Sequence, residues 1–560
     1  MNGGPQKHEG QDDVVEVDIP HANSSHSSPG PIHLIVIQDK SNHYPAIENL
    51  ISHFVSNSTH NVSQVTMENL QPSSGTYNRM DICIEVYEGF ENHLEKLVSF
   101  MTGNGSYMAS IPNIAFHIHY EPYSDWSEIN ESRRSIIMSA IDTLRSVAGP
   151  NVVHASIIHK YNSSTVFITE RDQLQELGHQ IQNDFSQFPK LHTLDYRENG
   201  LRFFPGVKFP LSLQTLNIGG GASLETLSGF KLPPSLKTLT VGSGSMTNID
   251  NISFPSTLEN LTVIENKIYF LEYVDFPPYL KHLDLSSNRI ESLQDVNFPL
   301  YLKSLNLSYN PIENIKGAKF PEKLEYLDIS HIPNESMAGI RLPDSIVSLN
   351  LQRSMTNIRG LKFPYNVKDL NIAHNGVNSV NPLKLPNSIE NLHLGYNNIK
   401  TLNKVQFPTS LKTLYVGNNL ITTLKNVQFP YTLEVLDFDN DAFREEQDKC
   451  LTSLKDVVLP PNLRVLKLGY HAIKSVEGIE MPANLTWLSL AHNGLKSIRN
   501  VTFGNNLKVL DLRGNFELYN IDQLQIPESV VDLRIPAQLI SYLPAYIIDR
   551  ANKGQLTLSK

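Results

Sequence analysis

The sequence has little cysteine, little tryptophan and little charge. Its 560 residues include two cysteines and two tryptophans, and 18% are charged, against about 25% in an average soluble protein. A secreted chain of this length would normally carry several disulfides, so two cysteines favour a reducing compartment. No run of 18 apolar residues occurs, and the sequence therefore predicts no membrane span.

The charge that is present has no basic excess. Lys and Arg number 46 and Asp and Glu 57, which gives a formal net charge of −11. Nucleic acids and anionic membranes are bound by basic patches, so neither is expected as a partner. Residues 1–30 are rich in His, Ser, Gly and Asp and lack the apolar core of a signal peptide. They are predicted to be a disordered tail of a cytoplasmic protein, with the nucleus as the alternative location.

Short catalytic and cofactor motifs are also missing. The sequence has no G-x-x-x-x-G-K-[ST], G-x-G-x-x-G, H-E-x-x-H, C-x-x-C or G-x-S-x-G segment. His117 and His119 alternate within a predicted strand and share one face, but two imidazoles fall short of the three or four ligands of a zinc site. We therefore expect no enzymatic activity, no cofactor and no bound metal.

What the sequence does contain is an internal repeat. A Phe-Pro dipeptide or a close variant recurs about sixteen times after residue 186, at intervals of 21 to 23 residues with a single interval of 30. Each unit follows the pattern L-x-x-L-x-L-x-x-N, as in the unit with Leu411, Leu414, Val416 and Asn419. This pattern resembles the leucine-rich repeat, in the 22-residue class found in internalins and in a phosphatase regulatory subunit.

The residues of one unit predict its local structure without the family name. The alternation in L-x-L turns two side chains inward and one outward, which indicates a short strand. Stacked in parallel, such strands form the concave sheet of a horseshoe-shaped α/β solenoid. The asparagine at position nine of each unit can bond backbone groups of its neighbours as a ladder. The proline favours an extended or 3₁₀ convex side rather than α-helix.

The segment before the repeats has a different pattern. Apolar runs predict strands at 33–38, 81–87, 113–120 and 151–159, alternating with helical patterns at 43–55, 91–100, 127–147 and 172–185. We predict a tail at 1–30, an irregular α/β N-terminal section or cap at 31–187, about sixteen repeats at 188–536, and a C-terminal cap and tail at 537–560. The alternative is that 31–187 form an independent α/β domain.

Candidate binding residues follow from the repeat positions. Positions three, five, seven and eight of each unit point out of the concave sheet. Position eight carries large polar side chains in five consecutive units, and position five carries a tyrosine and several aspartates. Such residues are typical interface anchors, although solvated sheet residues chosen for β-propensity would look the same. The predicted partner-binding residues are Tyr309, His331, Arg353, His374, Tyr396, Tyr415, Asp284, Asp328 and Asp437.

The function predicted from this surface is protein binding. The mixed acidic and aromatic face favours a basic protein or a peptide as partner, and the extra residues at 441–448 are expected to protrude beside it. We expect a monomeric, non-enzymatic intracellular interaction scaffold. The chain is also similar to fungal F-box/leucine-rich-repeat proteins, which implies a substrate-recognition subunit of an SCF-type ubiquitin ligase, but residues 1–60 contain no L-P-x-E-[IL] F-box segment. A phosphatase regulatory subunit is a weaker alternative, by analogy of repeat class.

Overall fold

The structure is a computed structural model of the chain. It describes residues 185–197, 207–219, 224–313, 315, 317–333, 340–354, 361–441, 451–499, 501–519 and 521–559, together with five strands and a few further residues before residue 185. The predicted tail at 1–30, nearly all of the four predicted helical stretches, and residues 442–448 of the insertion lie outside the described residues.

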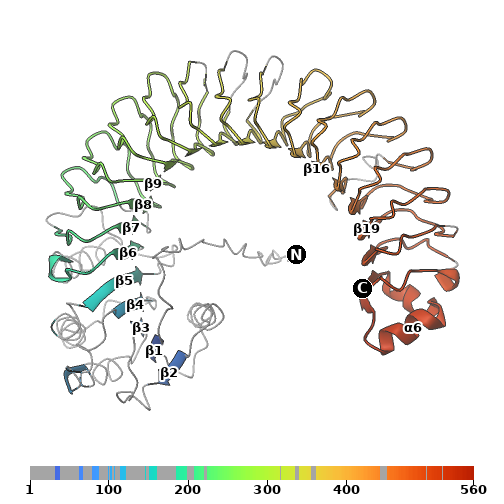
Figure 1. Ribbon diagram of the computed structural model, residues 1–560, viewed down its shortest axis with the longest axis horizontal. Helices are drawn as coiled ribbons and strands as arrows, with labels where there is room; N and C mark the ends of the chain where they lie inside the picture. Colours follow the sequence, from blue (N-terminus) through green and yellow to red (C-terminus); the bar gives the residue numbers. More distant parts are fainter. Residues whose placement is uncertain are drawn as a thin grey trace, which may run out of the picture.

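The described strands form one parallel sheet that curves into an arc (Figure 1). Each strand pairs with the next one along the chain, except at the start, where β1 lies between β2 and β3. The strands are β1 (Ile32–Ile37), β2 (Val62–Thr66), β3 (Arg79–Val86), β4 (Ile114–Tyr120), β5 (Val152–His159), β6 (Thr193–Arg197), β7 (Thr215–Gly219), β8 (Thr238–Gly242), β9 (Asn260–Val263), β10 (His282–Asp284), β11 (Ser304–Asn306), β12 (Tyr326–Asp328), β13 (Ser348–Asn350), β14 (Asp369–Asn371), β15 (Asn391–His393), β16 (Thr413–Tyr415), β17 (Val435–Asp437), β18 (Val465–Lys467), β19 (Trp487–Ser489), β20 (Val509–Asp511), β21 (Asp532–Arg534) and β22 (Thr557–Ser559).

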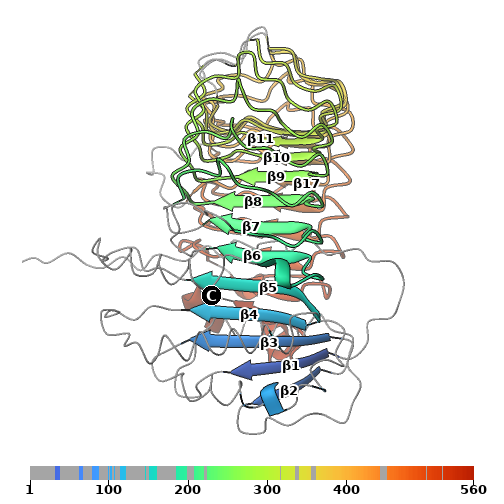
Figure 2. The ribbon, with the colours of Figure 1, turned by 90° about the vertical axis from the view of Figure 1, so that its left-hand side faces the viewer.

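The front section contributes five of these strands. The four predicted apolar runs appear as β1, β3, β4 and β5, whereas β2 was not predicted, because its sequence VSQVT has only two apolar residues. In β5, His154 pairs in parallel with Thr193 of β6, so the sheet continues without a break from the front section into the repeats (Figure 2). The five strands that precede β6 are thus part of the same sheet as the repeats.

The repeats share one core. Counting Leu280 as position one of its unit, the position-four residue Leu283 aligns in register with Leu261 and Leu305 of the two neighbouring strands. All three side chains are at most 1% exposed. Because each unit packs only against the units before and after it, the leucines build a continuous apolar column along the arc.

The predicted asparagine ladder is present. Asn310 Nδ2 donates to the carbonyl oxygens of Leu285 in the preceding unit (2.9 Å) and of Leu307 in its own unit (3.0 Å). Its Oδ1 accepts from the Ile290 amide at 3.0 Å. The same pattern recurs at Asn288, Asn397, Asn419, Asn493 and Asn515. The buried amides therefore satisfy backbone groups that the short strands leave unpaired.

A histidine takes over this role in one unit. His471 occupies position nine and is 1% exposed. Its Nε2 lies 2.8 Å from the Phe438 carbonyl oxygen, and its Nδ1 lies 2.9 Å from Asn440 Nδ2. A carbonyl only accepts and an amide nitrogen only donates, so the proton sits on Nε2 and the ring is neutral. The imidazole thus replaces the missing asparagine as a structural group rather than as a metal ligand.

The convex side is made of turns and extended segments, as the prolines predict. The backbone amide of Leu280 donates to the Pro277 carbonyl, and the phenylalanines of successive Phe-Pro pairs stack, with Phe276 and Phe298 at 6.3 Å between ring centroids. Regular helix is scarce among the described residues. The helices with described bounds are η4 (Phe185–Gln187), η6 (Ile521–Gln523), η7 (Ala537–Tyr542) and α6 (Ala545–Asn552).

The C-terminal end of the stack is covered by η7 and α6. Ile547 of α6 is fully buried, and the Tyr546 hydroxyl donates to the Leu524 carbonyl and accepts from the Ile526 amide, both at 2.9 Å. After α6 the chain returns to the sheet as β22, which pairs with β21 and was not predicted from the sequence. The short segment TLS carries too few apolar residues to be recognised as a strand.

Candidate interaction surface

Five of the predicted site residues form a row at position eight, directly after the strands. We call Tyr309, His331, Arg353, His374 and Tyr396 the stripe. Their φ angles lie between 50° and 56°, in the left-handed region. Their amides continue the sheet ladder, as when Tyr309 N–H donates to the Ser330 carbonyl at 3.1 Å. The backbone of the repeat thus imposes this conformation on whichever residue occupies position eight.

Large side chains are costly in this conformation. A left-handed φ costs a residue with a Cβ about 1–2 kcal/mol, and glycine or asparagine tolerates it best. Some other units have Ser243, Ser287, Asn418 or Gly514 at position eight, whereas Glu265, Tyr470 and His492 occupy it in three more. A requirement for stability alone would not select five successive bulky residues at this position. We infer that their side chains serve a purpose other than the stability of the fold.

The stripe is organised into stacked rings. The ring centroids of Tyr309 and His331 are 4.0 Å apart with an interplanar angle of 13°. Those of His374 and Tyr396 are also 4.0 Å apart, at 10°. Arg353 comes from the unit between these two pairs. The sequence predicted that the five side chains stand side by side, and the structure places them on five consecutive strand ends.

The histidines of the stripe are held neutral. Burial, followed by the positive charge of Arg353, lowers the pKa of both His331 and His374 from the usual value. The Nδ1 atom of His331 is also buried and has no hydrogen-bond partner among the described residues. At neutral pH the charge of the stripe therefore resides on the Arg353 guanidinium.

One end of the stripe is tied to the start of the insertion. The two carboxylate oxygens of Asp441 lie 2.7 and 2.6 Å from the Tyr396 hydroxyl. Asn418 holds the same residue, because its Oδ1 accepts from the Asp441 amide at 2.9 Å. Tyr396 is nevertheless 42% exposed and Tyr309 56% exposed. Both tyrosines therefore keep a large face open to solvent.

The predicted acidic residues of position five are engaged within the chain. Asp284 accepts from Asn306 Nδ2 at 3.0 Å and from the Ser286 amide at 2.9 Å. Asp328 accepts from Asn350 Nδ2 at 2.8 Å and from its own unit's Ser330 amide. These two carboxylates offer less to a basic partner than the sequence suggests. The alternation of Asp and Asn along position five is the sequence signal that could have revealed the pairing.

The remaining two site residues belong to other contacts. Tyr415 stacks on His393, with ring centroids 4.2 Å apart, and His393 is not among the binding residues predicted from the sequence. Asp437 forms an ion pair with Lys467 at 2.8 Å. The structure thus brings the five stripe residues together and leaves Tyr415 and the three aspartates in separate interactions.

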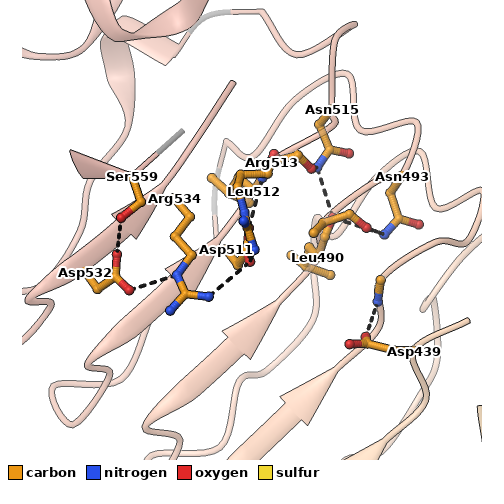
Figure 3. A network of polar contacts seen from close by, with 12 residues as sticks. Asp439, Leu490, Asn493, Asp511, Leu512, Arg513, Asn515, Asp532, Arg534 and Ser559 are labelled. Atoms are coloured by element: carbon orange, nitrogen blue, oxygen red, sulfur yellow. Dashed lines mark hydrogen bonds and ion pairs between the residues drawn. The ribbon is translucent and has the colours of Figure 1, made fainter. Parts of the chain in front are cut away.

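The C-terminal units carry a second set of charges, which are paired with one another. Asp511 contacts Arg513 at 2.6 Å, and Arg534 contacts Asp532 at 2.8 Å (Figure 3). In the same region Asp439 accepts from the Gly469 amide at 2.6 Å. Burial raises the pKa of Asp439 to about 6, Asp437 and Asp511 add to the rise, and the Gly469 amide and Lys467 oppose it.

The raised pKa of Asp439 predicts a pH-dependent loss of stability. The folded state keeps the Asp439 proton up to about pH 6, whereas the unfolded state releases it near pH 4. The protonated carboxyl therefore contributes its full stabilisation of the folded state below pH 4, and this contribution is lost as the pH rises through 6. Asp439→Asn should therefore raise the free energy of unfolding at pH 7.5 by about 1–3 kcal/mol and by much less at pH 4. Urea unfolding at the two pH values measures the difference. The exposed Asp275→Asn is the control, and an equal effect of both variants would contradict the assignment.

Within the described residues, no group of three or more His, Cys, Asp or Glu side chains is arranged to hold a metal ion. His117 and His119 lie in β4, but their side chains are outside the described residues. No helix in the described part of the chain has both the length and the apolar character needed to cross a membrane.

Two repeat models match separate segments of the chain. The leucine-rich repeat model matches residues 278–334, and the FNIP repeat model matches residues 380–419. No curated protein shows a significant sequence match to the chain.

Several solved structures resemble the chain at low identity. An internalin from Listeria monocytogenes is 17% identical, with 61% of this chain and 94% of that one aligned at a TM-score of 0.45. CroV588, a circular leucine-rich-repeat protein, is 17% identical over 85% of this chain and 64% of its own length, at 0.48. YopM, a leucine-rich effector protein from Yersinia pestis, is 21% identical over 62% and 84%, at 0.36. Values this low say nothing about what this chain binds.

Proposed function

As the chain is a leucine-rich-repeat protein, we propose that it is a non-enzymatic protein-binding scaffold that holds a partner against its concave face, with the stripe as the centre of contact. Leucine-rich-repeat proteins generally mediate protein–protein interaction. A curved solenoid suits this role, because its units contact only their neighbours and leave a long inner surface free.

The observation that carries the proposal is the combination of bulky residue type and left-handed backbone in the stripe. Tyr309 and Tyr396 remain 56% and 42% exposed although their backbone conformation is unfavourable for a large side chain. Tyrosine and arginine are enriched at the centres of interfaces, where they bury a large area and keep a polar tip. Binding to a partner would offset the cost of placing them at position eight.

The proposal extends to the setting in which the protein acts. We place it in the cytoplasm or nucleus as a monomer, because the chain has two cysteines and a net charge of −11. A role as a ubiquitin-ligase substrate receptor or phosphatase regulator would use the same concave face. No observation among the described residues favours either of these over a general scaffold.

Substitution of the stripe tests this function. Tyr309→Asn, His374→Asn and Tyr396→Asn combined should abolish capture of a partner and leave the fold intact, because asparagine suits a left-handed φ. Affinity purification with mass spectrometry compares the variant with the wild-type chain, and circular dichroism checks that both are folded.

The matched control changes the same residue type elsewhere. Tyr365→Asn combined with Tyr431→Asn removes two tyrosines that are 76% and 70% exposed and follow the Phe-Pro dipeptides. This control should capture the partners of the wild-type chain. Retention of all partners by the stripe variant would refute the proposed role of the stripe.

A further inference from the structure

The lysines and arginines of the concave face differ in whether a carboxylate of the chain pairs with them. At positions three, five, seven and eight of the described units, the Lys and Arg residues with described side chains are Arg353, Lys467, Arg513 and Arg534. Three of them have a carboxylate partner at 2.6 to 2.8 Å: Lys467 on Asp437, Arg513 on Asp511, and Arg534 on Asp532. Arg353 has neither an ion pair nor a side-chain hydrogen bond with any described residue.

The surroundings of Arg353 leave its charge unbalanced. The residues on either side in the stripe are His331 and His374, which are neutral at pH 7 because burial and Arg353 itself lower the pKa of each. Two carboxylates have a described influence on the histidines of this row, and both are bonded within the chain. Asp328 accepts from the Ser330 amide and from Asn350, and Asp441 accepts from the Tyr396 hydroxyl. Arg353 is exposed, with a φ of 50°.

We propose that Arg353 is the specificity anchor of the stripe and that it binds a carboxylate side chain of an acidic protein segment lying across the stacked rings. A guanidinium presents parallel N–H groups that match the two oxygens of a carboxylate. The inference rests on the proposed function, since it names the chemistry of the partner that the stripe receives. It replaces the basic partner expected from the sequence, because Asp284 and Asp328 are already bonded within the chain.

Charge balance favours a carboxylate over a phosphate. One unpaired cation matches one negative charge, whereas a phosphate group with a charge of about −1.5 to −2 at neutral pH would lack a second cation in the stripe. Tyr309 and Tyr396, on the outer sides of the two histidines, can cover apolar neighbours of the bound carboxylate.

A selection from random dodecapeptides displayed on phage tests the inference. Peptides selected by the wild-type chain should share an Asp or Glu at one aligned position, and selection by Arg353→Gln should lose this preference. In a synthetic copy of a selected peptide, changing the shared Glu to Gln should weaken binding to the wild-type chain at least about tenfold. The same change should have little effect on binding to Arg353→Gln. Arg353→Lys should recover part of the difference, because it keeps the charge but not the paired N–H groups.

Other results would overturn the inference. The first is a set of selected peptides that has no acidic preference or that prefers Lys or Arg. The second is an equal effect of the Glu-to-Gln change on binding to the wild-type chain and to Arg353→Gln. The third is displacement of the peptide by inorganic phosphate more readily than by acetate at the same ionic strength. Failure of the proposed function would look different. In that case the Tyr309→Asn and Tyr396→Asn variants would bind every selected peptide as well as the wild-type chain does.

Discussion

Replacing one ladder asparagine with alanine should be among the most damaging single changes in the repeats. Asn310→Ala removes the acceptor of the Ile290 amide and the donor to the Leu285 and Leu307 carbonyls. Each buried group left without a partner costs about 1–3 kcal/mol, so we expect the free energy of unfolding to fall by about 3–5 kcal/mol. Urea unfolding followed by circular dichroism measures this loss.

Two further variants show whether the loss comes from the hydrogen bonds. Asn398→Ala changes an exposed asparagine that follows the ladder residue Asn397, and it should cost little. Asn310→Ser should fall between wild type and alanine, since Ser354 at the same position of its own unit bonds the Leu351 carbonyl through its hydroxyl. An alanine variant as stable as the wild-type chain would mean that the ladder does not hold the units together.

The second large effect is expected in the apolar column. Leu283→Ala opens a cavity between Leu261 and Leu305, which are its partners in the neighbouring strands. Truncation of a buried leucine costs about 2–5 kcal/mol, from lost transfer energy and from the cavity. Thermal and urea unfolding should show this loss.

The matched control for Leu283 is a leucine outside the core. Leu300 is 78% exposed, and Leu300→Ala should change the stability by less than about 0.5 kcal/mol. If the two variants were equally stable, the register that places Leu283 inside the stack would be wrong.

The sequence predicted the repeat part of the fold well, because every unit has the same pattern of apolar residues, asparagine and proline. The alternation in Leu283-Asp284-Leu285 predicts a short strand, and β10 (His282–Asp284) contains the first two of these residues. The recurrence of asparagine predicts the contacts that Asn310 makes. By contrast, β2 and β22 have no repeat to support them and contain few apolar residues, so their pairing is determined by the neighbouring strands and not by their own sequences.

The sequence predicted which residues form the candidate site but not how their side chains contact one another. Period 22 places Tyr309 and His331 on adjacent units, and this is enough to predict that they are neighbours. Their stacking depends on the left-handed φ at position eight, which a sequence of Tyr and His does not indicate. The engagement of Asp284 by Asn306 depends on side-chain rotamers across two strands, and only the alternation of the two residue types along the column hints at it.

The central claim, that a partner is held against the stripe, is tested most directly by photo-crosslinking. A benzoylphenylalanine in place of Tyr309 puts the reactive group in the stripe, and the same residue in place of Tyr365 puts it after a Phe-Pro dipeptide. We expect illumination of the complex to join the partner to the chain carrying the probe at position 309 and not to the chain carrying it at 365. Crosslinks at 365 with none at 309 would contradict the account.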